Sequence, residues 1–491
     1  MKLDCTASSL LLGAALIATA GCVELDLTNP NQQTTDTFWQ NSNQAVQAVN
    51  ATYNALQNNG AYGRWQAFNF DIRSDIGFSP SPWADLSNYN KFTLVDYDFE
   101  VSRETWQHHY GAIFRANQAI ANVPNIDMET ALRDRLVGEA KFIRALLYFN
   151  LVNLYGGNIP LITEPSEPDT RPASSTEADV YTQIETDLTD AAAALPPSYA
   201  GGDVGRATRG AALALLGKAH LQQRDWAAAA TALQTVTTLG YDLIPSYAEN
   251  FTAANENNRE SVFEVQFGDR SLLASGVRGL NIAKMVGPCG PSFCDGRPTQ
   301  WYFDQFQQER TTTGAVDPRL DVTIFYNKPG GMDVYGQSFA QRYGAGSTDL
   351  YFKKYGEYYI AGDQDWDAAI NYRVIRYADV LLMLAEALNE QGQAAAAKPL
   401  VDRVRARVDL APLPAGLSQA EMRDRILHER LLEFGLEGQR FLDLKRHNLL
   451  TPALEAHDPE FAFFTPEKSE RLPIPVSERN LNPGVNQNPG W

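Results

Sequence analysis

Three glutamates near the C-terminal end of the chain have the residue type and the spacing that could support acid–base chemistry. Glu429, Glu433 and Glu437 recur every four residues in a stretch whose apolar residues follow a three- and four-residue period. This pattern predicts a helix over 422–447 that carries the three carboxylates on one face. Two carboxylates that hydrolyse a glycosidic bond must flank the sugar from opposite sides of a cleft. A single stripe along one packed helix does not have that geometry.

The same three glutamates have a structural interpretation. Like charges at four-residue steps repel each other unless nearby cations form ion pairs with them. Arg430 and Arg440 lie in the same stretch, and Arg403, Arg405 and Arg407 lie on the preceding predicted helix. We therefore interpret the glutamates as part of an ion-pair network that fixes how two helices dock, and we predict no enzymatic activity.

Metal chemistry finds little support in the sequence. His428 and Glu429 resemble the start of a zinc-protease helix, but the second histidine of that motif would fall at Leu432. Cys289 and Cys294 sit in a tight Cys-Gly-Pro-Ser-Phe-Cys turn that could close a small disulfide, and a metal site would need more ligands. The sequence predicts neither a metal nor a cofactor.

The composition bounds the class of protein. A chain of 491 residues that is 44% hydrophobic can bury a large core, and it is longer than a usual compact domain, so we expect one elongated array or two lobes. The formal charge of -18 argues against nucleic acid as a partner, because binding phosphates requires clustered Lys and Arg. No apolar run reaches the roughly 20 residues of a membrane helix.

The N-terminus reads as an export signal. A short apolar run over 10–18 precedes Thr19-Ala20-Gly21-Cys22, which resembles a bacterial lipobox. The expectation is cleavage after residue 21, lipidation of Cys22, and a tether over 22–41; ordinary secretory cleavage nearby is the alternative. Attached acyl chains would hold the protein at a membrane surface without a spanning segment.

Helical periodicity returns along most of the chain, and one pattern occurs twice. The Ala-rich run 227–233 comes back as 394–400, with matching leucine and valine positions upstream. Such hairpins resemble tetratricopeptide repeats, although two similar Ala-rich hairpins could arise by chance. We predict helices over 42–58, 102–123, 128–155, 176–195, 210–223, 226–239, 373–391, 393–408 and 422–447.

Two aromatic-rich stretches, 61–100 and 264–372, lose the helical period. Flat rings with few rotors suit the apolar faces of sugars, and neighbouring Arg, Asp and Asn can pair with hydroxyls. Ordinary core packing is the alternative for any one ring. The predicted ligand-binding residues are Trp83, Arg73, Asp75, Tyr89, Trp301 and Tyr302, with Tyr351, Tyr355 and Trp366 as the next candidates.

Several separated segments carry distinctive motifs. They are Glu139-Ala140-Lys141-Phe142-Ile143-Arg144-Ala145-Leu146-Leu147-Tyr148-Phe149; Leu154-Tyr155-Gly156-Gly157-Asn158-Ile159-Pro160-Leu161; Glu429-Arg430, Glu433-Phe434, Glu437-Gly438 and Arg440; Asp443-Leu444-Lys445-Arg446; Arg471-Leu472-Pro473-Ile474-Pro475; and Asn480-Leu481-Asn482-Pro483-Gly484 through Trp491.

In this order the segments closely resemble the SusD/RagB family of outer-membrane nutrient-binding lipoproteins. The resemblance implies a mostly α fold: a tetratricopeptide-like α-α superhelix with long loop-rich, aromatic-rich insertions. It also implies an N-terminal helical region over 42–265, a loop-rich insertion over 266–372, and a C-terminal region over 373–491 that packs with the first as one domain.

The function implied by the resemblance is capture of oligosaccharides or similar nutrients at the bacterial outer membrane. The implied partner is a TonB-dependent, SusC-like outer-membrane barrel that receives the ligand. Two other functions stay open from the residues alone: a helical-repeat scaffold that holds another polypeptide, and a secreted hydrolase that uses carboxylates on the loops.

Overall fold

The computed structural model describes residues 38–167, 169–457 and 463–491. The leader over 1–21, the lipidation residue Cys22 and most of the tether therefore lie outside the described residues and stay predictions. Within the described ranges, none of the helices combines the length and the apolar composition that crossing a membrane requires.

The first layer of the fold is formed by long helices that pack side by side. Asn41 caps the first of them with its side chain, and Thr176 closes a capping box at the last. Gly156, at φ 69°, ends the third, as its position before a second glycine predicts. The helices are α2 (Ser42–Ala55), α5 (Glu100–Asn122), α6 (Thr130–Tyr155) and α7 (Glu177–Ala194).

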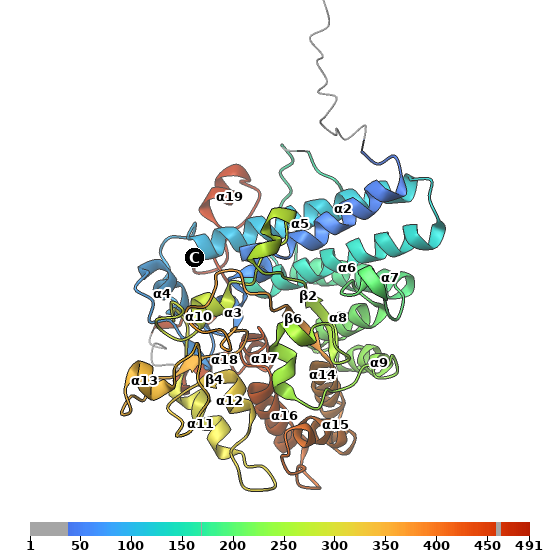
Figure 1. Cartoon of the computed structure of the whole chain (residues 1–491). Coiled ribbons are helices and arrows are strands. Elements are labelled where there is room, and N and C mark those ends of the chain that lie inside the picture. Colours follow the sequence, from blue (N-terminus) through green and yellow to red (C-terminus); the bar gives the residue numbers. More distant parts are fainter. Residues whose placement is uncertain (1–37, 168, 458–462) are drawn as a thin grey trace, which may run out of the picture.

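Two helical hairpins continue this layer (Figure 1). The first consists of α8 (Arg209–Gln222) and α9 (Trp226–Val236), and the second of α14 (Tyr377–Glu390) and α15 (Ala394–Arg407). The two Ala-rich runs lie in α9 and α15, which confirms the predicted pair of hairpins. Helix α7 packs on α8, and α9 packs on α14, so the array passes from one hairpin to the next. The mostly helical, tetratricopeptide-like fold is confirmed.

The predicted helix over 422–447 is broken. Helix α16 (Gln419–Glu433) ends before Phe434, and α17 (Arg440–Arg446) begins after a turn. The turn forms because Leu436 and Gly438 adopt positive φ angles of 65° and 73°, which an α-helix does not allow. Glu437 consequently sits in the turn and not on the helical stripe.

A second correction concerns the predicted helix over 373–391. Its first residues belong to strand β6 (Tyr372–Arg376), which pairs antiparallel with β2 (Ser261–Val265). The run Tyr-Arg-Val-Ile-Arg is rich in aromatic and β-branched residues that fit a strand, and helix α14 starts directly after it. Two-residue strands make the other pairs: β1 (Gly77–Phe78) with β3 (Arg297–Pro298), and β4 (Ile324–Phe325) with β5 (Tyr351–Phe352).

The aromatic-rich stretches contain short helices joined by long loops, and, among the described residues, two further short helices follow α17. One extended hydrophobic core joins most of these segments to the helical layer, while Phe339 packs in a smaller cluster with Phe325, Tyr335 and Tyr351. The short helices are α3 (Gln66–Phe70), α4 (Ala84–Asn90), α10 (Ile282–Val286), α11 (Gln300–Gln308), α12 (Arg319–Thr323), α13 (Phe339–Tyr343), α18 (Leu450–His457) and α19 (Val476–Leu481).

Candidate functional site

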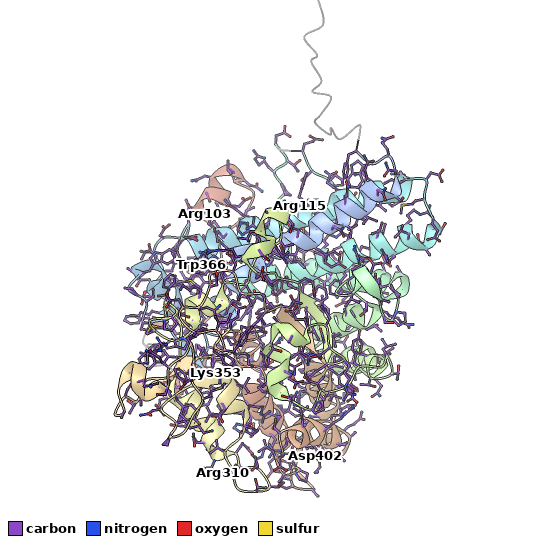
Figure 2. The ribbon with its side chains drawn as sticks, in the orientation of Figure 1. Arg103, Arg115, Arg310, Lys353, Trp366 and Asp402 are labelled. Atoms are coloured by element: carbon purple, nitrogen blue, oxygen red, sulfur yellow. A yellow bond between two sulfur atoms is a disulfide. The ribbon has the colours of Figure 1, made fainter. Side chains whose placement is uncertain are left out.

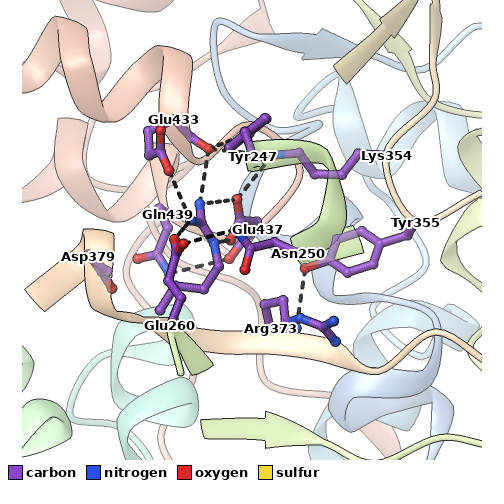
Figure 3. A network of polar contacts seen from close by, with 12 residues as sticks. Tyr247, Asn250, Glu260, Lys354, Tyr355, Arg373, Asp379, Glu433, Glu437 and Gln439 are labelled. Atoms are coloured by element: carbon purple, nitrogen blue, oxygen red, sulfur yellow. Dashed lines mark hydrogen bonds and ion pairs between the residues drawn. The ribbon is translucent and has the colours of Figure 1, made fainter. Parts of the chain in front are cut away.

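The three glutamates predicted to be structural are all buried, and Figure 3 shows two of them, Glu433 and Glu437, in one network of polar contacts. Glu433 lies fully buried and accepts hydrogen bonds from Arg319 at 3.0 Å and Arg376 at 2.9 Å. Glu437 reaches the same place from the turn, and it binds Arg376 through both carboxylate oxygens, at 2.8 and 2.9 Å. Glu429 pairs with Arg319 at 2.6 Å. The cluster therefore joins α16, the turn after it, α12 and β6.

The predicted ion-pair network is confirmed, but with different partners. Arg405 binds Glu429 and Arg407 binds Glu433, as expected from the preceding helix. The other three arginines pair elsewhere: Arg403 with Asp242, Arg430 with Asp379 and Asp443, and Arg440 with Asp75.

The cluster has the properties of a structural site. Burial alone would raise the pKa of Glu433, but Arg407, Arg376 and Arg319 together hold that pKa well below its usual range. A general acid or base needs a pKa near the working pH and an oxygen within reach of substrate. All six carboxylate oxygens of the three glutamates accept hydrogen bonds from cationic side chains. The geometry therefore holds helices together and offers no oxygen to a substrate.

Four of the predicted ligand residues lie in the interior. Arg73 contacts the rings of Tyr89 and Phe92 and donates to the carbonyl oxygen of Ser469 at 2.8 Å. The Tyr89 hydroxyl donates to Asn69. Asp75 accepts hydrogen bonds from two nitrogens of the Arg440 guanidinium, at 2.7 and 2.8 Å. Tyr302 is fully buried. None of the four presents a surface to a ligand in this structure.

The two predicted tryptophans are more accessible. Trp83 is 37% exposed and packs edge-on against Trp65 and Phe99. The ring of Trp301 is partly exposed and stacks on His457 with the centroids 4.0 Å apart. Among the described residues the two rings pack on different partners, and no ring–ring contact joins Trp83 to Trp301.

Trp83 instead begins a different row of aromatic groups. Its ring contacts Trp65, and the Arg64 guanidinium lies 4.9 Å from the centroid of Trp65 and 4.8 Å from that of Trp366. The ring of Trp366 contacts Phe293 at 5.5 Å, and Phe293 is 52% exposed. We call Trp83, Arg64, Trp366 and Phe293 the aromatic platform. Figure 2 shows Trp366 in the part of the molecule that carries α4 and α10 in Figure 1.

Polar groups accompany the rings of the aromatic platform. Arg64 is held by Glu100 at 3.2 Å, and the indole nitrogen of Trp65 donates to Glu104 at 2.7 Å. Both carboxylates are only partly buried. Exposed ring faces beside a charged, hydrogen-bonding rim are the arrangement that binds an amphipathic ring such as a pyranose.

A disulfide holds one end of the aromatic platform. Cys289 and Cys294 are bonded to each other, and the loop that they close carries Phe293. The ammonium of Lys284 lies 5.3 Å from the Phe293 ring centroid and donates to the carbonyl oxygen of Pro291 in the same loop. The loop that presents Phe293 is therefore fixed from two sides.

Sequence reasoning names Trp83 and, as a further candidate, Trp366, but it does not single out Arg64 or Phe293. Arg64 precedes a tryptophan in a loop, and Phe293 sits between the two cysteines, so a cysteine-closed loop with a large apolar tip was the available signal. No local spacing relates residue 64 to residue 366, because only the tertiary fold brings them together.

Comparisons with known proteins agree with this architecture. A family model described as "SusD family" matches residues 259–491, and one described as "Starch-binding associating with outer membrane" matches residues 25–221. The chain is 28% identical to SusD-like protein P25 of Formosa agariphila, over 91% of both chains.

Solved structures give the same result. A SusD superfamily protein of Bacteroides vulgatus superposes with a TM-score of 0.84 at 27% identity, covering 93% of this chain and 100% of that one. A laminarin binding SusD-like protein superposes with a TM-score of 0.76 at 30% identity, covering 92% and 100%. From the two family matches, these relatives and the shared helical architecture, we conclude that the chain belongs to the SusD/RagB family.

Proposed function

We propose that this protein is an outer-membrane lipoprotein that binds oligosaccharides on the aromatic platform and delivers them to a TonB-dependent, SusC-like barrel. The observation that carries the proposal is the row of partly exposed rings, Trp83, Trp366 and Phe293, with Arg64 held between two indoles. Membership of the family supports it, because one similar protein is described as binding laminarin and one matching family model as starch-binding.

Stacking accounts for how such a platform would hold a glycan. A ring face that is open to water buries apolar area only when a sugar covers it, so the hydrophobic gain is realised on binding. Arg64 stays fixed by Glu100 and by the faces of two indoles, which lowers the entropy lost when its guanidinium pairs with sugar hydroxyls. The platform therefore suits an extended oligosaccharide that contacts several rings at once.

A glycan screen tests the binding half of the proposal. The chain without residues 1–22 is presented with laminari-oligosaccharides, malto-oligosaccharides and other neutral glycans, and binding is measured by calorimetry. We expect at least one oligosaccharide to bind, longer oligosaccharides of the same type to bind more tightly, and the bound oligosaccharide to remain unhydrolysed. Release of new reducing ends would favour a hydrolase, and capture of peptides in place of glycans would favour a scaffold.

The anchoring half is tested at Cys22. Acylation needs a thiol, so Cys22→Ser should move the protein from the membrane fraction to the soluble fraction of the cell envelope. Co-purification of the wild-type lipoprotein with a TonB-dependent barrel from gently solubilised membranes tests the partner. Unchanged membrane attachment of the Ser variant would contradict lipidation at Cys22.

A further inference from the structure

We infer that a second, separate ligand site lies around Lys353 and takes a small molecule that carries one oxyanion group, a carboxylate or a sulfate. A cavity of about 190 Å³ lies beside β4, and the Lys353 side chain lines it. Its other walls include Phe325, Phe339 and the turn at Gly330 and Gly331. None of these residues belongs to the aromatic platform, and Figure 2 shows Lys353 apart from Trp366.

Lys353 is a buried cation without an anionic partner in the described part of the chain. The residue is 6% exposed, and its backbone N–H donates to the Thr323 carbonyl oxygen at 2.9 Å, which fixes it directly after β5. The ammonium contacts the Met332 sulfur at 3.3 Å and lies 4.5 Å from the ring centroid of Tyr358. A thioether and a ring face are weak substitutes for the water that the ammonium has lost.

The acid whose charge acts on Lys353 is already engaged. One oxygen of Asp321 accepts the Tyr326 hydroxyl at 3.0 Å, and the other is bound by Lys328. Asp321, which also lines the cavity, is thus already paired with Lys328, and among the described residues no carboxylate forms an ion pair with the Lys353 ammonium. The next residue shows the contrast: Lys354, which is also buried, pairs with Glu437 at 3.0 Å.

The shape and chemistry of the cavity define the ligand class. The volume is below the roughly 300 Å³ at which pockets for drug-sized ligands begin, so it suits a single sugar ring or a short organic acid. The rings of Phe325 and Phe339 would cover the apolar part of the ligand, and Lys353 would pair with its oxyanion as a point charge. A uronic acid and a sulfated monosaccharide share this chemistry.

Proton linkage gives the site a distinctive signature. Burial lowers the pKa of Lys353 to about 8, and an oxyanion beside the ammonium would raise it again. Ligand binding near pH 8.5 should therefore take up a proton, whereas binding at pH 6.5 should not, because Lys353 is already charged there.

Calorimetry on the detergent-solubilised full chain tests the inference. The probes are glucuronate, glucose 6-sulfate and inorganic sulfate, with glucose as the neutral control. We expect one or more of the oxyanions to bind, and Lys353→Met to weaken that binding about tenfold or more, the loss of one charge-assisted hydrogen bond. The matched control is Lys398→Met, which removes a lysine from a surface pair with Asp402 and should bind like the wild type.

The outcomes separate the possibilities. Binding of glucuronate alone, or of the sulfates alone, identifies the oxyanion. The inference is overturned if no oxyanion binds, if glucose binds as tightly, if Lys353→Met keeps full affinity, or if Trp83→Ala abolishes binding and so moves it to the aromatic platform. Should Lys353→Met not fold, proton uptake by the wild type in buffers of different ionisation enthalpy decides: no uptake at pH 8.5 contradicts the site.

Discussion

Replacing Glu433 by Ala removes the central carboxylate of the buried ion-pair cluster. Glu433 is the shared partner of Arg319, Arg376 and Arg407, and each arginine keeps at least one other carboxylate after the change. Arg319 keeps Asp317 and Glu429. Arg376 keeps Glu260 and Glu437, and Arg407 keeps Glu260. Breaking a buried ion pair by removing one partner costs about 3 to 5 kcal/mol. Because the remaining carboxylates compensate part of the charge, we expect about 3 kcal/mol.

This free energy translates into a small but measurable shift of the melting temperature. At about 2.1 cal/mol/K per residue, roughly 450 ordered residues unfold with an entropy near 1 kcal/mol/K, so the variant should melt about 3 °C lower. Differential scanning calorimetry at pH 7 measures the shift. The matched control is Asp424→Ala, which removes an exposed acid from the same helix. It should change the melting temperature by less than about 1 °C. Equal melting temperatures for wild type and Glu433→Ala would refute the structural role.

Three further predictions concern single features. Burial lowers the pKa of Lys353 from an ordinary 10.5 to about 8, so the unfolded chain binds more protons than the folded one between these pH values. The wild type should therefore become more stable by up to about 3 kcal/mol as the pH rises from 8 to 10.5, and Lys353→Met should lack this gain. Equal pH dependence of the two proteins in thermal scans would contradict this. Removing the disulfide through Cys289→Ser and Cys294→Ser should weaken glycan binding several-fold and lower the melting temperature by only about 2 °C, because closing so short a loop stabilises the fold by about 2 kcal/mol; full affinity in calorimetry would show that the loop plays no part. Trp301→Ala should lower the free energy of unfolding by less than the roughly 3 to 5 kcal/mol lost on truncating a fully buried Trp, and it should leave glycan affinity unchanged; lost affinity would return Trp301 to the ligand site.

The long helices could be predicted from sequence because their signals are local. Capping residues, the apolar period and the Gly156 stop all act within one or two turns, and the structure ends α6 where they indicate. The break after Glu433 has a different origin. Its turn is held by tertiary contacts: the Gly438 N–H donates to Asp71 at 2.7 Å, and a side chain at Gly435 would collide with the Tyr302 hydroxyl.

The candidate site, like the fold, is set partly by local sequence signals and partly by tertiary contacts. Aromatic loops with nearby charges indicate a binding function, and this pattern includes Trp83 and Trp366 among the candidate rings. Which rings face water depends on packing across hundreds of residues: Tyr89 and Tyr302 are buried, while Phe293 is lifted to the surface by a disulfide-closed loop. Arg319 and Arg376 reach the glutamate cluster from α12 and β6, and no spacing along α16 contains that information.

The most direct test of the account is the affinity of the tightest-binding oligosaccharide for platform variants. Trp83→Ala and Trp366→Ala are compared with Trp226→Ala, which truncates a partly buried tryptophan on α9, outside the aromatic platform. We expect the two platform variants to lose about tenfold or more in affinity while keeping their fold, as truncated aromatic anchors do, and the control to bind like the wild type. Full affinity in both platform variants would contradict the proposed site.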